Sequence, residues 1–400
     1  MPASRHPSFR LPRHAVVPDY GEGGLFGLVG AVRRFLDGEP WRLPTDPLPA
    51  PLPGDSAPVV VFILVDGLGD LFLQRFGTGS ALLAHRAGRL TSVFPSTTAS
   101  AVTTVLTGQA PAAHGLTGWY LHDRRFGGVI APLPMTQRAG GEVRGVLRLP
   151  RLFPYRTLFQ GRRRPSVFVS PRSLAQSPYS RRHSRGARVV AYRGLDGMIA
   201  AVADAVMASR DAGGGYVHAY YPNFDALSHA HGCASREVVD EFGRIDTAFR
   251  ALLVRLAGSG IEVVVSADHG FIDSPDDRLI HLDRHPEAIA MLAAPLFGER
   301  RAAFCEVRRG AGAEFEGFVR EVFAGKARLV RAEELLASGL LGPGRAHRRL
   351  RERVGSHTLL METGWTVRDR VPGERNHPML GVHGGLSPGE MWVPLVRARC

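Results

Sequence analysis

The sequence has few cysteines and no long apolar run, and each shortage argues against a class of protein. Its three cysteines, Cys233, Cys305 and Cys400, lie far apart and form no CxxC pair. This spacing disfavours a disulfide framework or a thiolate zinc site and favours free thiols in a reducing compartment. No run approaches the length of a membrane span, and residues 1–20 lack the apolar core of a secretory signal. We therefore expect a soluble, cytoplasmic protein with no membrane partner.

Lysine is almost absent, so arginine carries nearly all of the positive charge. Lys326 is the only lysine, whereas lysine and arginine together number 50 against 37 acidic residues, which gives a formal net charge of +13. Arginines are densest in residues 161–165, 181–185 and 345–353, but no nucleic-acid-binding motif accompanies these runs. We expect solvated basic faces that attract a small phosphorylated substrate, with no nucleic acid as partner. The sequence leaves the oligomeric state open.

Three uniformly apolar runs alternate with amphipathic segments along the chain. The runs lie in residues 59–65, 216–225 and 261–270, and such runs are typical of strands buried on both faces. Apolar residues recur at helical spacing in residues 195–209 and 235–257. Alternation of buried strands and helices predicts an α/β fold with a mostly parallel central sheet.

The predicted domain organisation has a core interrupted by an insert. We expect residues 1–57 to be an N-terminal extension, and residues 58–272 and 379–400 to form the core. Residues 273–378 differ in character, with a predicted strand in "RAAFCEVRR" and a predicted helix in "AEFEGFVREVFAG". They are predicted to form a smaller α+β cap inserted into the core.

Acidic and imidazole side chains follow the buried runs directly. Asp66 ends the first run, Asp225 the second, and Asp268 with His269 the third. In open parallel sheets, functional groups gather outside the carboxyl ends of the strands. A carboxylate at the end of an apolar strand is stable only beside a cation or a dense set of hydrogen bonds. The pattern therefore predicts a polar site at one edge of the sheet.

Two further histidines extend this set toward a metal site. His229 follows Asp225 by four residues, which places both side chains on one face of a helical turn. His383 lies between glycine-containing segments near the C-terminal end. Each residue alone would also fit a turn, a helix cap or a loop histidine, but their joint placement at strand ends favours a metal site. Carboxylates with imidazoles suit a divalent ion, with zinc first and manganese or iron as alternatives.

A run of hydroxyl side chains, "VFPSTTASAVTTVLTG" in residues 93–108, predicts a helix of small residues. Pro95 and Ser96 suit its entrance, Ser96 or Thr97 its N-cap, and Gly108 its C-terminal end. A helix N-terminus binds anions through its free N–H groups. A threonine hydroxyl there is a poor nucleophile until a cation lowers its pKa. The pattern itself does not specify which hydroxyl acts.

Six segments together resemble the alkaline phosphatase superfamily, specifically its type I phosphodiesterase/nucleotide pyrophosphatase family. In order, they are "VDGLG", "FPSTTASAVTTVLTG", "PAAHGLTG", "FDALSH", "SADHG" and "GVHGG". The resemblance begins near residue 59 and continues to the C-terminal region. It implies an alkaline-phosphatase-like three-layer sandwich with an α+β insert. It also implies a two-metal hydrolase that cleaves phosphodiesters or pyrophosphates through a covalent phospho-threonine intermediate.

The same resemblance implies a role for each site residue. The family's nucleophile begins a helix that ends nine residues later in Thr-Gly, which here gives Thr98, with Thr97 as the alternative. The implied ligands of the two divalent ions are Asp225, His229 and His383 for one, and Asp66, Thr98, Asp268 and His269 for the other.

One position departs from the family pattern. Where the family carries an asparagine that binds a phosphate oxygen, this chain has Trp119, which either stacks on a ring, donates one N–H or packs under the insert. Backbone N–H groups near Thr98, Tyr120 or an arginine of the insert are alternative phosphate ligands.

The alternative functions are a phosphomonoesterase, phosphomutase or phosphonate hydrolase on the same scaffold, and a non-catalytic metal-binding member of the family.

Overall fold

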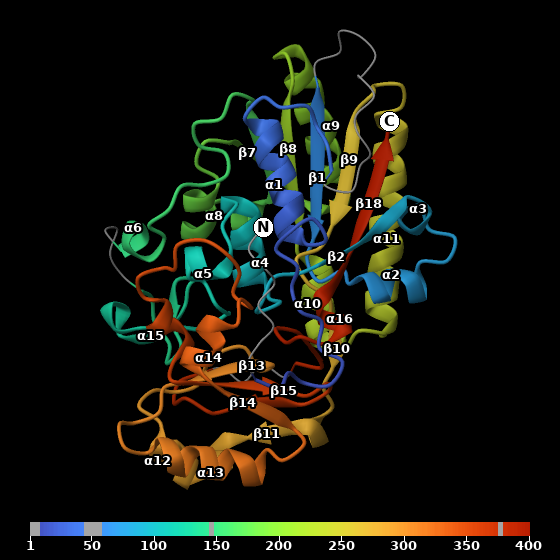
Figure 1. Cartoon of the computed structure of the whole chain (residues 1–400). Coiled ribbons are helices and arrows are strands. Elements are labelled where there is room, and N and C mark those ends of the chain that lie inside the picture. Colours follow the sequence, from blue (N-terminus) through green and yellow to red (C-terminus); the bar gives the residue numbers. More distant parts are fainter. Residues whose placement is uncertain (1–8, 44–57, 144–147, 375–378) are drawn as a thin grey trace.

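A seven-stranded, mostly parallel sheet forms the centre of the molecule (Figure 1). The computed structural model describes residues 9–43, 58–143, 148–374 and 379–400. The strand order is β2-β18-β9-β1-β8-β6-β7. The central strand β1 (Val59–Val65) pairs in parallel with β8 (Gly215–Tyr221) and β9 (Glu262–Ser266). β1 and β9 are buried along their whole length, which confirms that uniform apolar runs mark the inner strands.

The outer strands extend this sheet on both sides. Beyond β8 lie β6 (Ser166–Pro171) and β7 (Arg188–Tyr192), both parallel to their neighbours. On the other side, the C-terminal strand β18 (Trp392–Arg399) runs antiparallel to β9 and to β2 (Arg86–Thr91). The carboxyl ends of β9, β1, β8, β6 and β7 therefore share one edge of the sheet.

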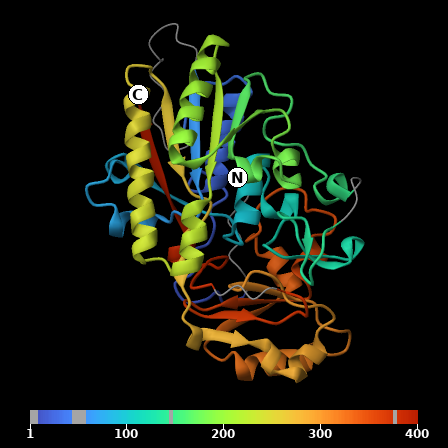
Figure 2. The same cartoon turned by 180° about the vertical axis from the view of Figure 1, so that it is seen from behind.

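Helices cover both faces of the sheet and make three layers (Figures 1 and 2). On one face lie α9 (Gly194–Asp211) and α11 (Arg236–Arg255), which pack against each other, and α9 contacts β1, β6 and β8. These helices confirm the amphipathic segments predicted at 195–209 and 235–257. On the opposite face lie α1 (Leu25–Leu36) and α4 (Thr98–Thr107), which contact each other. Through buried residues such as Leu28 and Phe35, α1 belongs to the main core although it precedes β1.

A second, antiparallel sheet lies below the first in Figure 1. Its strands are β12 (Phe297–Gly298), β13 (Ala302–Cys305), β15 (His357–Met361) and β14 (Ala327–Arg331), in that order. Helices α12 (Pro286–Met291) and α13 (Gly312–Val322) lie beside it and share a separate apolar cluster with it. The strand and helix expected in this part of the chain are therefore present. The division into an extension, a core and a cap stays a prediction.

The chain leaves the main sheet and returns to it at adjacent positions. β10 (Ile272–Asp273) pairs antiparallel with β17 (Gly381–Val382), and Ile272 faces Val382 in this pair. The pairing brings two segments more than a hundred residues apart to the same place. His383, directly after β17, is thereby carried to the edge where β9 ends.

Shorter elements connect these layers. The helices are α2 (Asp70–Phe76), α3 (Ala81–Ala84), α5 (Pro111–His114), α6 (Arg148–Leu152), α7 (Arg172–Ala175), α8 (Pro178–His183), α10 (Asn223–His231), α14 (Ala332–Ala337), α15 (Leu350–Val354) and α16 (Pro388–Met391). Two small sheets contain β3 (Leu121–Asp123), β4 (Gly128–Ala131) and β5 (Thr136–Gln137), and β11 (Leu279–His281) with β16 (Thr366–Arg368).

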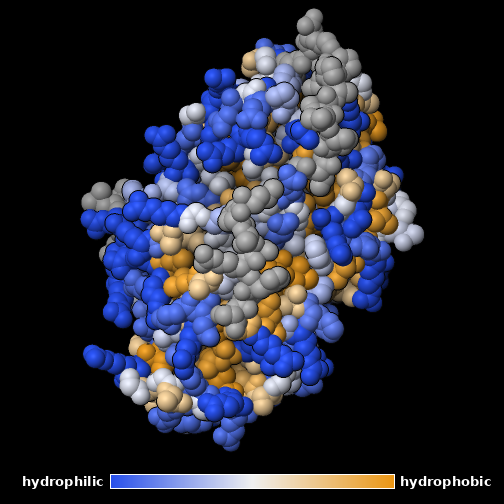
Figure 3. All heavy atoms as spheres, viewed as in Figure 1, coloured by the Kyte–Doolittle hydropathy of each residue, from blue (hydrophilic) through white to orange (hydrophobic). Residues whose placement is uncertain are grey.

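The arginine runs are partly structural rather than solvated. Hydrophilic side chains cover much of the face in Figure 3, yet Arg353 is fully buried, 3.3 Å from Asp123, and donates to the Gly115 carbonyl at 2.7 Å. In another run, Arg162 pairs with Asp37 at 2.8 Å.

All three cysteines are free thiols. Among the helices that the structure describes, none has the length and apolar character needed to cross a bilayer. The cytoplasmic location stays a prediction.

Candidate metal centre

The predicted site residues converge at the carboxyl ends of β1, β8 and β9. Asp66 follows β1, Asp225 lies in the first turn of α10 after β8, and Asp268 lies just beyond β9. All seven predicted residues lie in one cluster: Asp66, Thr98, Asp225, His229, Asp268, His269 and His383. The cluster is formed by the parallel sheet, because its inner strands end side by side.

One group of donors in this cluster contains Asp225, His229 and His383. Asp225 Oδ1 lies 3.5 Å from His229 Nε2 and 3.8 Å from His383 Nε2. The two Nε2 atoms are 3.1 Å apart. The helical turn of α10 thus presents Asp225 and His229 together, as their spacing predicted, and the return of the chain through β17 adds His383.

A second group contains Asp66, Asp225 and His269. His269 Nε2 lies 3.4 Å from Asp66 Oδ1 and 3.9 Å from Asp225 Oδ1. Asp268 Oδ2 is 3.4 Å from the same Nε2 atom. Asp225 therefore belongs to both groups of donors, whereas the family resemblance implied that it holds only one ion.

The Thr98 hydroxyl faces this second group. Thr98 is the first residue of α4, and its Oγ1 lies 3.4 Å from Asp66 Oδ1 and 3.2 Å from His269 Nε2. The Thr97 hydroxyl donates instead to Glu299 Oε1 at 2.6 Å. At the other end, Gly108 closes the helix with a φ of 67°. Of the two candidate threonines, it is Thr98 that points its hydroxyl at the carboxylates and imidazoles.

Backbone carbonyls orient all three imidazoles. The Nδ1 atom of His229 lies 2.8 Å from the Gly381 oxygen, that of His269 3.1 Å from the Gly270 oxygen, and that of His383 3.2 Å from the Ser96 oxygen. An Nδ1–H that donates to a carbonyl leaves the Nε2 lone pair free for another partner. The three Nε2 atoms therefore present lone pairs to the cluster.

Burial controls the protonation of this cluster. It lowers the pKa of His229 to about 4 and that of His269 to about 3, so both imidazoles are neutral near pH 7. Burial also raises the pKa of Asp268 to about 7, and burial together with the neighbouring Asp268 carboxyl raises that of Asp66. Crowded carboxyl groups in a dry site ionise fully only when a positive charge lies among them.

The donors fit a divalent cation. Asp225 Oδ1 and Asp268 Oδ2 are buried and have no hydrogen-bond partner among the described residues. Both atoms point toward neutral imidazole nitrogens, and two of those nitrogens lie 3.1 Å apart with their lone pairs directed at each other. A cation among them would satisfy the unpaired oxygens and the facing lone pairs at once. Carboxylate and imidazole ligands suit zinc, manganese or iron.

A glycine turn allows the carboxylates to approach one another. Gly67 has a φ of 78°, and a Cβ atom there would lie 2.4 Å from the ring of Phe271. Its N–H donates to Asp268 Oδ1 at 3.1 Å. A larger residue would therefore be strained and would displace Phe271, which packs edge-on against His269. The Asp-Gly pair after β1 is thus a turn and part of the cluster.

Sequence reasoning missed three residues that support the cluster. The Tyr220 hydroxyl donates to Asp66 Oδ2, and the Ser92 hydroxyl donates to the backbone oxygen of Asp268. Glu299, from the second sheet region, accepts the Thr97 hydroxyl. A tyrosine at the end of an apolar strand was a usable signal for Tyr220, because its polar tip needs a partner. No local pattern marks Glu299 or Ser92.

Trp119 lies at the rim of this site and is 40% exposed. Its backbone N–H donates to Glu299 Oε1 at 2.6 Å, the same oxygen that accepts the Thr97 hydroxyl. Next to it, the Tyr120 backbone pairs with Gly298, so the loop that carries Trp119 is fixed against β12. Glu299 therefore links the start of α4 to the loop in which the expected phosphate-binding asparagine is missing.

A buried ion pair supports the loop that carries His383. Arg301 donates to both carboxylate oxygens of Glu390, at 3.0 and 2.9 Å, and both side chains are almost fully buried. Glu390 also accepts the backbone N–H of Gly385 at 2.7 Å and the Ser387 hydroxyl at 2.6 Å. The pair therefore joins the second sheet region to the segment just after His383.

Glu390→Gln should destabilise the protein by about 3–5 kcal/mol, because it leaves the buried Arg301 guanidinium without its counter-charge. Urea unfolding followed by circular dichroism measures this change. Asp240→Ala is the matched control, since it removes an exposed helical ion pair with Arg236 and should change the free energy of unfolding by less than about 1 kcal/mol. An unchanged unfolding midpoint for Glu390→Gln would show that the pair is dispensable.

Comparison with protein families gives one match over most of the chain. The model of the family described as type I phosphodiesterase / nucleotide pyrophosphatase matches residues 60–386. This range includes the whole cluster from Asp66 to His383. A comparison with curated protein sequences gives no match.

Several solved structures share the fold. Murine ectonucleotide pyrophosphatase / phosphodiesterase 5 matches with a TM-score of 0.63 and 16% identity, over 84% of this chain and 87% of that chain. Its inactive threonine-to-alanine variant in complex with AMP has a TM-score of 0.62, with the same identity and coverage. Phosphonoacetate hydrolase from Sinorhizobium meliloti 1021, in complex with phosphonoacetate, has a TM-score of 0.62 and 19% identity, over 86% and 90% of the chains. These matches confirm the predicted alkaline-phosphatase-like α/β fold.

Proposed function

Because this chain belongs to the type I phosphodiesterase/nucleotide pyrophosphatase family, we propose that it hydrolyses phosphodiesters or pyrophosphates of small molecules through a covalent phospho-threonine at Thr98. The observation that carries this proposal is the position of the Thr98 hydroxyl, at a helix N-terminus and within 3.4 Å of Asp66 and His269. The murine relative whose threonine-to-alanine variant is described as inactive supports it.

We propose two divalent ions, with zinc favoured by the ligand chemistry and manganese or iron as alternatives. The proposed ligands are Asp225, His229 and His383 for one ion, and Asp66, Thr98, Asp268 and His269 for the other. The position of Asp225 Oδ1 near all three imidazoles supports a ligand that contributes to both sites. When bound, such ions lower the pKa of a hydroxyl and offset the negative charge of phosphoryl oxygens.

The protein itself supplies the nucleophile and its alignment. Thr98 Oγ1 gives its proton to solvent and forms a bond to phosphorus, while the bond from phosphorus to the leaving alcohol oxygen breaks and that oxygen takes up a proton. The phosphoryl group on Thr98 keeps the remaining ester group of the substrate. Water then attacks the same phosphorus and breaks its bond to Thr98 Oγ1, which releases the phosphate product and restores the hydroxyl. The Asp66 carboxylate, held by the Tyr220 hydroxyl, keeps the Thr98 hydroxyl in place.

The start of α4 offers an anion-binding surface beside the nucleophile. No side chain caps this helix, because the Thr97 hydroxyl is bound to Glu299 instead. The Ser100 N–H donates to the Thr97 carbonyl at 3.0 Å, so the N–H groups of Thr98 and Ala99 are the ones proposed to bind a phosphoryl oxygen. We propose that they take over the role of the missing asparagine, with Trp119 as an exposed wall for the organic part of the substrate.

Comparing rates on four substrates tests the proposed function. With zinc or manganese added, bis-p-nitrophenyl phosphate should be cleaved at least about 10-fold faster than p-nitrophenyl phosphate, and p-nitrophenyl sulfate should not react. Phosphonoacetate is the fourth substrate, because the Sinorhizobium meliloti enzyme in the comparisons is a phosphonoacetate hydrolase. A higher kcat/KM on phosphonoacetate would move the assignment to phosphonate hydrolysis. No reaction on any phosphorus ester, with two ions bound, would favour the non-catalytic alternative.

Glu299→Ala should lower kcat/KM on the diester by about 10- to 100-fold, because the Thr97 hydroxyl and the Trp119 N–H lose their shared acceptor and the loop shifts against α4. Glu299→Gln keeps an acceptor oxygen and should retain most of the activity. Steady-state kinetics of both variants measure the effect. Equal rates for Glu299→Ala and the wild type would contradict this positioning role.

A further inference from the structure

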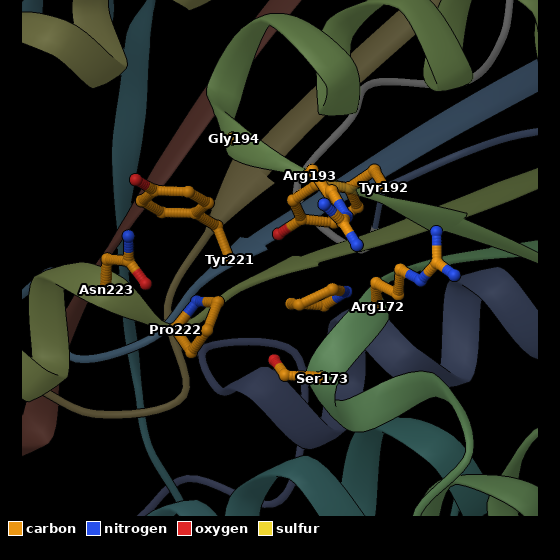
Figure 4. Close-up of a pocket in the computed structure, with 9 residues that line it drawn as sticks. Arg172, Ser173, Tyr192, Arg193, Gly194, Tyr221, Pro222 and Asn223 are labelled. Carbon is orange, nitrogen blue, oxygen red and sulfur yellow. The ribbon is translucent and has the colours of Figure 1, made fainter.

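A separate pocket lies on the same edge of the sheet as the seven-residue cluster, which is called the metal-ligand cluster below. It is formed where β6, β7 and β8 end, and has a volume of about 470 Å³. Figure 4 shows Arg172 and Arg193 on one side of this pocket and Asn223 on the other. None of the seven residues in the cluster lines it. The pocket is therefore a separate recess at the edge where α/β proteins bind ligands.

Two arginines give this pocket its charge. Arg172 begins α7 directly after β6, and Arg193 follows β7, so they reach the pocket from two different segments. Neither side chain forms an ion pair or hydrogen bond with any residue in the described ranges. No acidic residue is among those that line the pocket. Two guanidinium groups facing one recess without a carboxylate favour a bound anion.

Neutral donors surround the two arginines. Ser173 and Asn223 add a hydroxyl and an amide to the lining. The 18-residue helix α9 begins at Gly194 and has no side-chain cap, so its first N–H groups stay available on this side. A side chain at Gly194 would meet nothing within 4 Å, which leaves the backbone there open to a ligand. All these groups donate hydrogen bonds or carry positive charge.

We propose that this pocket binds a small organic anion through a phosphate group. A phosphate has enough oxygens to accept from both guanidinium groups and from the neutral donors, whereas a carboxylate has only two. The volume exceeds that of a phosphate ion, and the rings of Tyr192 and Tyr221 form part of the wall, so an organic portion also fits. The proposal does not depend on the hydrolase function, because it uses none of the residues of the metal-ligand cluster.

The pocket is connected to that cluster through the protein. The Tyr192 hydroxyl donates to the backbone oxygen of Tyr220 at 2.7 Å, and the Tyr220 hydroxyl donates to Asp66. Asn223 is the first residue of α10, which carries Asp225 and His229. A ligand in the pocket would therefore contact the same strand end and helix that position the cluster.

Isothermal titration with inorganic phosphate tests the site on the full-length protein. The double variant Arg172→Ala/Arg193→Ala should bind phosphate at least ~10-fold more weakly than the wild type, since it loses two charge-assisted donors. Arg255→Ala is the matched control: it removes one exposed arginine on α11 and should leave the affinity unchanged. Both arginines of the pocket are exposed and unpaired among the described residues, so the double variant should fold normally, as its melting temperature checks.

A second titration, in which the arginines are replaced in Asp225→Asn protein, separates this site from the metal-ligand cluster. In Asp225→Asn protein, the phosphate-binding event should persist and should again weaken at least ~10-fold when both arginines are replaced. Equal affinities with and without the arginines, in either background, would overturn the proposal and assign phosphate binding to the cluster. Loss of binding in Asp225→Asn alone, or acetate binding as tight as phosphate, would also overturn it.

Discussion

Thr98→Ala should lower the hydrolysis of bis-p-nitrophenyl phosphate by about 10³-fold or more. The substitution removes the only hydroxyl that lies within hydrogen-bond reach of both Asp66 and His269 among the described residues. Loss of a covalent nucleophile removes the two-step route, and only slow direct attack by water remains. The initial rate with a saturating divalent metal measures the effect, and mass spectrometry of acid-quenched wild-type protein should detect a p-nitrophenyl phosphate group on residue 98.

Thr97→Ala is the matched control for this prediction. It removes a hydroxyl one residue earlier, which donates to Glu299 rather than to the cluster. We expect it to lower the rate by no more than about 10-fold, because it loses a positioning hydrogen bond and no reacting atom. If Thr97→Ala were the inactive variant and Thr98→Ala kept its activity, the register of the nucleophile would be shifted by one residue and the proposed mechanism would be wrong.

Asp225→Asn should lower the bound metal from about two ions per chain to one or fewer, and the diesterase activity by at least about 100-fold. Asp225 Oδ1 lies within 3.9 Å of the Nε2 atoms of His229, His269 and His383. The loss of its negative charge therefore affects both proposed ion sites, whereas the loss of another ligand affects one. Elemental analysis of purified protein gives the metal content, and the diester assay gives the rate.

Asp204→Asn serves as the control for the change of charge. Asp204 is an exposed residue of α9, away from the cluster, and this variant should keep both its metal and its activity. His383→Ala gives an intermediate case, because His383 belongs to one proposed ion site, and it should retain about one ion. If Asp225→Asn kept two ions and full activity, the cluster would not be the metal centre.

Several elements of the site were predictable from local sequence. The inner strands β1 and β9 were identified because a strand buried on both faces must be apolar at every position. The pairing of Asp225 with His229 followed from helical geometry, since residues four apart share one face. The sequence also displays the type of donor at each position, carboxylate or imidazole, and these donor types favour a divalent cation.

The sequence by itself determined the fold class, the types of donor side chain and the edge of the sheet where these side chains meet. The tertiary structure decided the rest: that Thr98 rather than Thr97 faces the cluster, that Asp225 lies beside all three imidazoles, and that Glu299 occupies the rim. The physical reason is that periodicity and strand-end position depend on neighbouring residues, which a sequence displays directly. The direction of a side chain depends on how segments distant in the sequence, such as β10 and β17, pack together. The same packing decides its partner, as with Thr97 and Glu299, which are about two hundred residues apart.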